Sequence, residues 1–350
     1  MTLPVYVWQP GTAAIAARAG ISASGVIRAD QNTSPFRPPW ASGVARAATT
    51  SINEYPDAGY RSLRESIARY LEVDPEMVVP GAGADEMILL SAKAWLGPGD
   101  RAVAESPTYP LYRIATLQQG AAYDEVPRSS GEPGFPAGAL AAAASGAALT
   151  WLCIPSNPVG DRADDAGVQA VVDAAGGITV IDAAYAEFIG DRWGGHAARS
   201  PAVVVLGTLS KAFGLAGARV GYAVAGPEEA SILDRLRPPG SLSTMSVALA
   251  ERALAETAWM EEHVARVVEL RGALAGGLRS LGLAPRPSVT NFVLCEVGGN
   301  AHAVAEALMD RGIVVRTFPD EHPLAHHIRI TVRIAEQQER LLEVLGEELR

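Results

Sequence analysis

The sequence has few of the residues that mark a nucleic-acid-binding, disulfide-bonded or metal-binding protein. Lysine and arginine number 29 against 39 aspartates and glutamates, which gives a net charge of -10 at pH 7 and leaves no basic cluster to neutralise nucleic-acid phosphates. The two cysteines, Cys153 and Cys295, stand far apart in apolar runs, so we expect buried thiols in a reducing compartment rather than a disulfide. The 6 histidines show no metal-ligand spacing. Neither nucleic acid nor a metal is therefore expected as a partner.

Long hydrophobic runs are lacking too. The segment 1–8 has neither the basic start nor the unbroken apolar stretch of a signal peptide. The stretch 137–154 is mostly apolar, but two glycines, a serine and a threonine interrupt it, so no run is long enough to cross a bilayer. With 48% hydrophobic and 19% charged residues over 350 positions, the composition predicts a globular cytoplasmic protein with a core large enough for two lobes.

What the chain does contain is a strand that leads to a reactive lysine. The run 203–206 is apolar and β-branched and a glycine follows it, which predicts a strand with Lys211 at its carboxyl end, where ligands bind in open α/β sheets. Among small and apolar residues an ammonium is poorly solvated, so the lysine pKa should fall and the neutral amine can form a Schiff base. Thr208 and Ser210 offer hydroxyls, and Arg219 offers a guanidinium suited to a phosphate dianion. These groups fit pyridoxal phosphate.

Two further segments could serve the same cofactor. Asp182 ends the predicted strand 178–182, and a buried carboxylate there needs a partner, such as a pyridinium nitrogen, because an unpaired one would be neutralised by a raised pKa. Residues 78–86 predict a short strand, a Gly-rich turn and a helix start, whose backbone N–H groups can bind an anion. Taken alone, the Gly-x-Gly at 81–83 is equally typical of an ordinary tight turn.

Together these segments resemble a known family. Ser-Lys-x-x-Gly-Leu-x-Gly-x-Arg at 210–219 is the active-site signature of the fold-type I pyridoxal-phosphate aminotransferases, and the chain from about 30 to 347 is most similar to their histidinol-phosphate aminotransferase branch, in class I/II. The other matching motifs are Tyr-Pro-Asp at 55–57, Gly-Ala-Asp-Glu at 83–86, Pro-Thr-Tyr-Pro at 107–110 and Asn-Pro-x-Gly at 157–160.

The resemblance implies an α/β fold, with a large domain built on a mostly parallel central sheet flanked by helices and a smaller α/β domain. An N-terminal arm would span 1–45 and join the small domain, with a short helix near Thr12 to Ala19. The large cofactor-binding domain would span 46–237 and the small domain 238–350. The family is homodimeric, so we expect a second copy of the chain as a partner.

The resemblance also implies a role for each matched residue. Lys211 would bind pyridoxal phosphate and move the proton, Asp182 would keep the cofactor ring protonated, and Tyr185 would donate a hydrogen bond to its O3′ atom. The remaining cofactor-binding residues would be Ala84, Asp85, Tyr109, Asn157, Thr208, Ser210 and Arg219, with Tyr55 reaching the other subunit's site. The substrate-binding residues would be Arg316, Arg329, Asn32 and Phe36. Core packing for Tyr109, and a surface position for Arg316, stay open as plainer interpretations.

The chain departs from the family pattern at several positions. Phe36 replaces a tyrosine whose hydroxyl lies near the substrate phosphate, Ala183 replaces a glutamate, Arg333 replaces a glycine, and 241–245 replaces a Tyr-Asn-Val-like run. The expected reaction is transamination of an amino acid or amino-alcohol phosphate, with a 2-oxo acid such as 2-oxoglutarate as acceptor. The departures keep a decarboxylase or another specialised pyridoxal-phosphate enzyme open as an alternative. A cofactor-binding regulator without chemistry is the other alternative, and the retained active-site residues argue against it.

Overall fold

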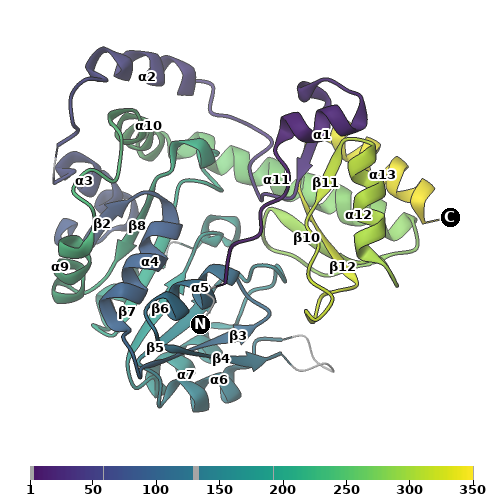
Figure 1. Ribbon diagram of the computed structural model, residues 1–350. Coiled ribbons are helices and arrows are strands. Elements are labelled where there is room, and N and C mark those ends of the chain that lie inside the picture. Colours follow the sequence, from purple (N-terminus) through teal and green to yellow (C-terminus); the bar gives the residue numbers. More distant parts are fainter. Residues whose placement is uncertain (1–3, 58, 129–133, 192, 350) are drawn as a thin grey trace.

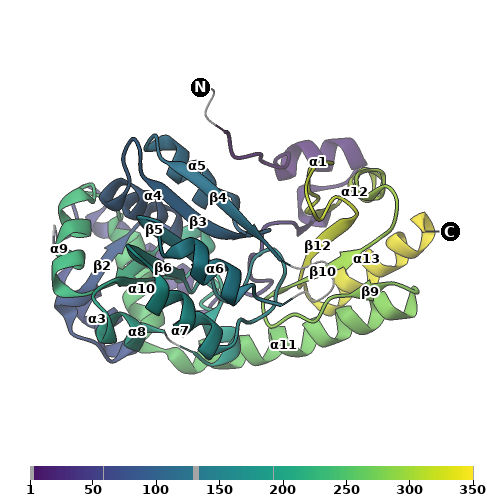
Figure 2. The same cartoon turned by 90° about the horizontal axis from the view of Figure 1, so that it is seen from below.

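The computed structural model describes residues 4–57, 59–128, 134–191 and 193–349. Figure 1 shows two lobes, a larger one around a wide twisted sheet and a smaller one that contains both the segment around α1 (Thr12–Ala19) and the C-terminal helix α13 (Ala335–Glu348). The long helix α11 (Thr257–Ser280) runs along both lobes (Figure 2). None of the helices in the described ranges is both long and apolar enough to cross a membrane.

The large lobe is built on a seven-stranded sheet. Its order is β2-β8-β7-β6-β5-β3-β4, and β8 runs antiparallel to both of its neighbours while β7, β6, β5, β3 and β4 run parallel. The strands are β2 (Val78–Gly81), β3 (Arg101–Ser106), β4 (Ala122–Pro127), β5 (Leu149–Cys153), β6 (Ile178–Asp182), β7 (Val203–Thr208) and β8 (Gly221–Val224). The predicted α/β fold with a mostly parallel central sheet is confirmed.

Helices cover both faces of this sheet, as the strand sequences require. In β7, Val203 and Val205 belong to one buried cluster and Val204 and Leu206 to the other, because successive side chains of a strand point to opposite faces. One face packs against α4 (Gly83–Trp95), α5 (Pro110–Gln118) and α9 (Pro227–Leu236). The other packs against α3 (Arg61–Leu71), α6 (Ala137–Ala144) and α7 (Asp165–Ala174), with α8 (Gly194–Arg199) next to β7. A fully apolar strand such as 203–206 is therefore buried on both sides.

The small lobe combines both ends of the chain. Strand β10 (Phe292–Glu296) lies antiparallel between β9 (Ala284–Pro285) and β12 (His327–Thr331), and β1 (Ile27–Ala29) pairs in parallel with β11 (Ile313–Val315). Helix α12 (Ala301–Asp310) packs with α1 and α13. The predicted helix near Thr12 to Ala19 is present as α1. The predicted boundaries of arm and domains at 45/46 and 237/238 stay a prediction.

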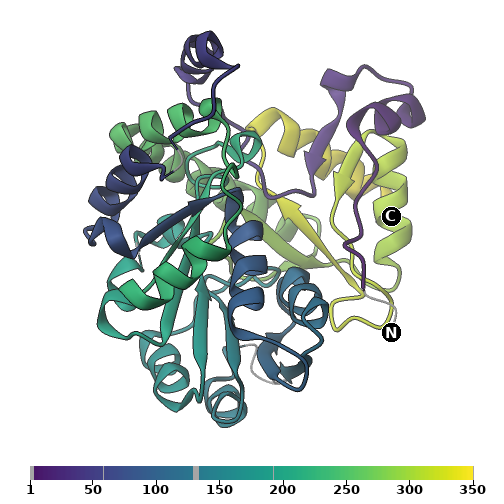
Figure 3. The same cartoon turned by 60° about the vertical axis from the view of Figure 1, so that its left-hand side comes forward.

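The remaining helices connect these parts. Helices α2 (Ala41–Ala48) and α10 (Thr244–Ala255) pack on each other, and Figure 3 shows the segment around α2 projecting beyond the large lobe. The short 3-10 helices are η1 (Ala23–Gly25), η2 (Thr49–Ser51), η3 (Pro75–Met77), η4 (Ala186–Ile189) and η5 (Ala216–Ala218).

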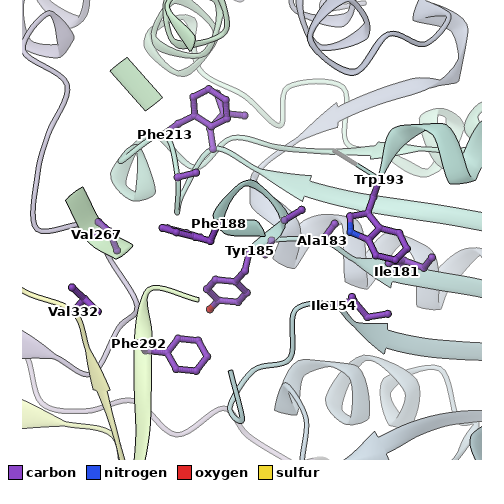
Figure 4. Close-up of a cluster of buried hydrophobic side chains, with 14 of the residues drawn as sticks. Ile154, Ile181, Ala183, Tyr185, Phe188, Trp193, Phe213, Val267, Phe292 and Val332 are labelled. Carbon is purple, nitrogen blue, oxygen red and sulfur yellow. The ribbon is translucent and has the colours of Figure 1, made fainter. Parts of the chain in front are cut away.

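The two lobes meet through a buried aromatic and aliphatic cluster. Tyr185, just after β6, and Phe292, at the start of β10, have ring centroids 5.5 Å apart in an edge-to-face arrangement. Figure 4 shows these rings next to each other, with Phe188 on the large-lobe side and Val332 on the small-lobe side. The contact places the carboxyl ends of the central strands opposite β10 and β12.

Candidate active site

A cavity of about 400 Å³ lies between the lobes, at the carboxyl ends of the central strands. Most of the residues predicted for the site line it together, although they come from segments more than 200 positions apart. They are Asn32, Ala84, Asp85, Tyr109, Asn157, Asp182, Tyr185, Thr208, Ser210, Lys211, Arg219, Arg316 and Arg329.

Lys211 lies in the turn after β7, and its amine faces the cavity. Burial, together with the positive charges of Arg329 and Arg219, lowers its pKa from 10.5 to about 8. The Nζ atom donates a hydrogen bond to the backbone oxygen of Asn32 over 3.2 Å. A substantial fraction of this amine is therefore neutral near pH 8, which is the form that attacks a carbonyl.

Asp182 ends β6 inside the protein, where only 5% of its surface is exposed. Burial raises its pKa to about 6, although hydrogen bonds from the Tyr112 hydroxyl and the Ala184 N–H partly offset the effect. These donors lie 2.7 Å from Oδ2 and 3.1 Å from Oδ1. The carboxylate is thus oriented, but it lacks a full counter-charge, which a cationic ring nitrogen would provide.

Tyr112 was not expected at the site from the sequence. It lies on α5 three residues after Tyr109, is fully buried, and stacks on Trp151 of β5 with ring centroids 5.2 Å apart. Its hydroxyl reaches Asp182 across 70 positions of sequence. The available signal was the spacing of three residues between Tyr112 and Tyr109, the residue that directly precedes α5.

The amino end of α4 and the turn around Arg219 form a compact pocket for an anion. The first N–H groups of a helix have no carbonyl partner in a preceding turn, and here they belong to Gly83, Ala84 and Asp85. A Cβ atom on Gly83, whose φ is +85°, would come within 2.6 Å of the Arg219 guanidinium. A Cβ atom on Gly221 would lie 2.5 Å from the Ala84 nitrogen. Both glycines therefore allow β8 and the arginine to approach the helix start.

Side chains complete this pocket. Arg219 pairs with the Asp85 carboxylate over 2.9 Å, and the Tyr109 hydroxyl donates to the other Asp85 oxygen over 3.0 Å. The hydroxyl groups of Thr208 and Ser210 lie 2.9 Å apart at the end of β7. Two hydroxyls, one guanidinium and a helix start make a donor set that suits a phosphate dianion.

Asn157 and Tyr185 are held with hydrogen-bond donors available to a ligand. The Asn157 Oδ1 atom accepts a bond of 2.6 Å from Arg329, which leaves its amide NH₂ group to donate. The Tyr185 oxygen accepts a bond of 2.8 Å from the Asn32 amide, so its own hydrogen can be donated elsewhere. Asn32 has a left-handed backbone, with φ of 52°, at this position.

Arg316, the residue directly after β11, and Arg329 of β12 form an antiparallel backbone bridge. Arg329 contacts Asn157 and the Asp30 carbonyl, whereas Arg316 donates to the Val7 carbonyl over 3.1 Å. Within the part of the chain that the structure describes, neither guanidinium forms an ion pair with a carboxylate. Two unneutralised cations at one end of the cavity favour an anionic ligand.

Three residues singled out in the sequence lie elsewhere. Phe36 lines a second cavity of about 470 Å³, where the Arg266 guanidinium lies 3.9 Å from its ring centroid, so the structure does not bring it into the first cavity. Tyr55 is 93% exposed. Arg333 contacts Gln337 and the Thr33 carbonyl, behind the cavity wall rather than in it.

Residues 23–345 match the family described as aminotransferase class I and II. The chain belongs to this aminotransferase family. It is a pyridoxal-phosphate-dependent aminotransferase of fold type I, as the motifs indicated, and the interpretation as a decarboxylase is not favoured.

Individual relatives agree over nearly the full length. A histidinol-phosphate aminotransferase of Symbiobacterium thermophilum is 35% identical over 325 residues, covering 91% of this chain and 90% of the relative. Another, of Methanopyrus kandleri, is 33% identical over 373 residues, covering 100% of this chain and 95% of the relative. The crystal structure of histidinol-phosphate aminotransferase from Sinorhizobium meliloti in complex with pyridoxal-5′-phosphate is 29% identical, covers 98% of this chain and 95% of its own, and has a TM-score of 0.90.

The cavity of this aminotransferase fits pyridoxal phosphate on its own chemistry. The buried Asp182 carboxylate, whose pKa is raised, would be stabilised by a cation. The pocket at the start of α4 suits a dianion, and the Lys211 amine can attack a carbonyl carbon. One ligand combines all three complements: a pyridinium nitrogen, a phosphate and an aldehyde.

Proposed function

We propose that this aminotransferase transfers an amino group from an amino acid or an amino-alcohol phosphate to a 2-oxo acid such as 2-oxoglutarate. The observation that carries the proposal is the placement of a lysine amine with a pKa near 8 in one cavity with two arginines that have no carboxylate partner in the described chain. The amine suits proton transfer near neutral pH, and the arginines suit an anionic substrate.

In this proposal each residue has a defined task. When bound, pyridoxal phosphate supplies an electron sink for the reaction. Lys211 would hold the cofactor, and its Nζ atom would take the proton from the donor's α-carbon. Asp182 would keep the ring nitrogen protonated, and Tyr185 and Asn157 would donate hydrogen bonds to O3′. The phosphate would be bound by Ala84 and Asp85, through backbone N–H groups, together with Thr208, Ser210 and Arg219, and Tyr109 would pack on the ring.

Arg316 and Arg329 bind the substrate's anion in the proposal, with Asn32 beside them. A guanidinium pair accepts either a carboxylate or a phosphate, so the arginines alone do not select between an amino acid and an amino-alcohol phosphate. The names of the relatives direct the choice of first donor to histidinol phosphate.

The proposed enzyme is a homodimer, with Tyr55 reaching the phosphate in the other subunit. The support is that Tyr55 is 93% exposed and does not line the cavity of its own chain. Mixing inactive Lys211→Ala and Tyr55→Ala subunits tests this arrangement, because a mixed dimer then contains one intact site. We expect about a quarter of the wild-type activity to return after mixing and reassembly. If Tyr55 acted within its own chain, no activity would return.

We also propose a cytoplasmic location, because Cys153 and Cys295 are both buried free thiols.

The reaction itself is tested with the purified holoenzyme. Histidinol phosphate and a panel of amino acids are added in turn while the absorption band of the bound cofactor is followed. Loss of the band with one donor, formation of the oxo product, and return of the band with 2-oxoglutarate are the expected results, and Lys211→Ala should show none of them. Release of carbon dioxide without an oxo product would overturn transamination, and so would a band that no amine alters.

A further inference from the structure

The turn that carries Lys211 is packed closely against two other segments of the chain. Gly214 ends this turn with a φ of +64°, and a Cβ atom on it would come within 3.1 Å of both the Phe36 carbonyl oxygen and the Trp259 ring. Phe36 lies in the segment between β1 and α2, and Trp259 lies near the start of α11, which runs along both lobes (Figure 2). Both residues line the second cavity, which therefore borders the turn of the reactive lysine.

His263 lies where these segments meet, and only 3% of its surface is exposed. It follows Trp259 by one helical turn and stacks on it, with ring centroids 5.0 Å apart and planes at 10°. The Phe36 ring meets the imidazole edge-to-face at a centroid distance of 5.9 Å. These contacts fix the plane of the imidazole, and with it the directions of both ring nitrogens.

Both nitrogens of His263 bind groups next to the lysine site. The Nδ1 atom lies 2.6 Å from the carbonyl oxygen of Ala212, and because a carbonyl only accepts, Nδ1 donates this bond. Ala212 directly follows Lys211 in the chain. The Nε2 atom forms a hydrogen bond of 2.7 Å with the Ser34 hydroxyl. Ser34 stands two residues after Asn32, whose carbonyl oxygen accepts the 3.2 Å bond from the Lys211 amine. One imidazole thus restrains the backbone that carries the lysine and the segment that the amine contacts.

We propose that His263 is a positioning residue that holds the Lys211 amine at its working place in the active-site cavity. His263 lies outside the set of described residues that line this cavity, so it acts through its two hydrogen bonds and not by touching a ligand. The inference rests on the proposed role of Lys211. A leucine would also fill the space beside Trp259 and Phe36, so substitution can separate the hydrogen bonds from the packing.

The test is a double-mutant cycle on cofactor binding, which needs no turnover. Dissociation constants of pyridoxal phosphate from the apoprotein are measured by equilibrium dialysis at pH 8. The proteins are the wild type, His263→Leu, Lys211→Ala and the combination of both substitutions. Val268→Ala, at a position of α11 that is 37% exposed, is the control and should bind the cofactor as the wild type does.

His263→Leu should bind the cofactor about tenfold more weakly than the wild type. In the Lys211→Ala background the same substitution should change the dissociation constant less than about twofold, because its effect passes through the lysine. A residue that only supports the fold would weaken binding equally in both backgrounds. That result, or no weakening in either background, would overturn the proposal.

Two polar substitutions separate the hydrogen bonds and carry the test should His263→Leu not fold. In His263→Asn the amide can stand near the Nδ1 position and still donate to Ala212, whereas in His263→Gln it stands near the Nε2 position and offers no such donor. Because Ala212 adjoins the lysine, the asparagine variant should retain more of the cofactor affinity. Equal affinities, or the reverse order, would overturn the proposal.

Kinetics give a second measurement. In the half-reaction with an amine donor, the rate constant at saturating donor should fall in the same order of variants, while the half-saturating donor concentration stays within about twofold. Lys211→Ala alone reports on the proposed function. If it bound the cofactor as tightly as the wild type, with the same absorption band, the role of Lys211 itself would be wrong. Failure of every amine to react with the wild type would count against transamination and leave the binding cycle unaffected.

Discussion

Replacing Asp182 with asparagine should stabilise the apoprotein while it removes the partner of the cofactor ring. Asparagine has nearly the same shape and can keep both hydrogen bonds of the carboxylate. Its oxygen can accept from the Ala184 N–H, now 3.1 Å from Oδ1, and its NH₂ group can donate to the Tyr112 oxygen, now 2.7 Å from Oδ2. The variant therefore differs from the wild type mainly in lacking a buried negative charge.

The size of the effect follows from the pKa of Asp182, which burial raises from 3.8 to about 6. Between these values the folded apoprotein holds more protons than the unfolded chain, so its stability falls as the pH rises through this window. Each pKa unit corresponds to about 1.4 kcal/mol, so the ionised carboxylate costs on the order of 3 kcal/mol at pH 8. Integrated to pH 5, the same cost is only about 1.5 kcal/mol, since a large share of the folded molecules is still protonated there.

The assay is urea unfolding of the apoprotein at pH 5 and pH 8, at one fixed protein concentration. Asp182→Asn should be more stable than the wild type at both values, with about twice the gain at pH 8. Asp173→Asn, at an exposed position of α7, is the matched control and should show no such change. An equal gain in stability at both pH values, or a loss of stability at pH 8, would refute the view that the apoprotein holds a buried negative charge whose partner is the cofactor.

Two further substitutions probe the site. Tyr112→Phe removes the bond of 2.7 Å to Asp182, so the pKa of the Asp182 carboxyl should rise further. The cofactor should then dissociate roughly 10- to 100-fold more readily, as measured by equilibrium dialysis. An unchanged affinity would contradict a positioning role for Tyr112. Gly221→Ala places a Cβ atom 2.4 Å from the Gly83 carbonyl carbon, so cofactor binding should be lost. The control Gly217→Ala, whose Cβ atom meets nothing within 4 Å, should bind the cofactor normally. Equal cofactor binding by both variants would contradict the close packing of β8 on α4.

Individual strands of the central sheet could be predicted from their local sequence, whereas the complete sheet was implied by the resemblance to the family. The run 203–206 is apolar throughout, and a strand of that kind fits only a sheet covered on both faces, as β7 is. A strand that is buried on both faces is apolar throughout, and a strand that is buried on one face alternates apolar and polar residues, so both kinds can be recognised in the sequence.

The motif residues could likewise be named from the sequence, because the residues beside them predict a strand end, a turn or a helix start. Lys211 follows a strand, and Ala84 and Asp85 open a helix after a glycine turn. The comparisons show the family and the cofactor that these motifs indicated. The role of each residue stays a proposal, because the motif names a residue but does not measure what it binds.

Other features depend on contacts between segments that are distant in the sequence, and such contacts cannot be predicted from neighbouring residues. The bond from Tyr112 to Asp182 spans 70 positions, and the contact of Arg316 with Val7 spans 309. Nothing in the sequence near Tyr6 indicates that it lies beside Tyr109, or that Phe36 lies under Arg266 instead of in the active-site cavity. The sequence by itself determined the sheet, the helices and the reactive residues, since these follow from neighbours a few positions apart. Which side chains share one cavity was decided only by the tertiary structure, because the packing of the two lobes brings together residues from opposite ends of the chain.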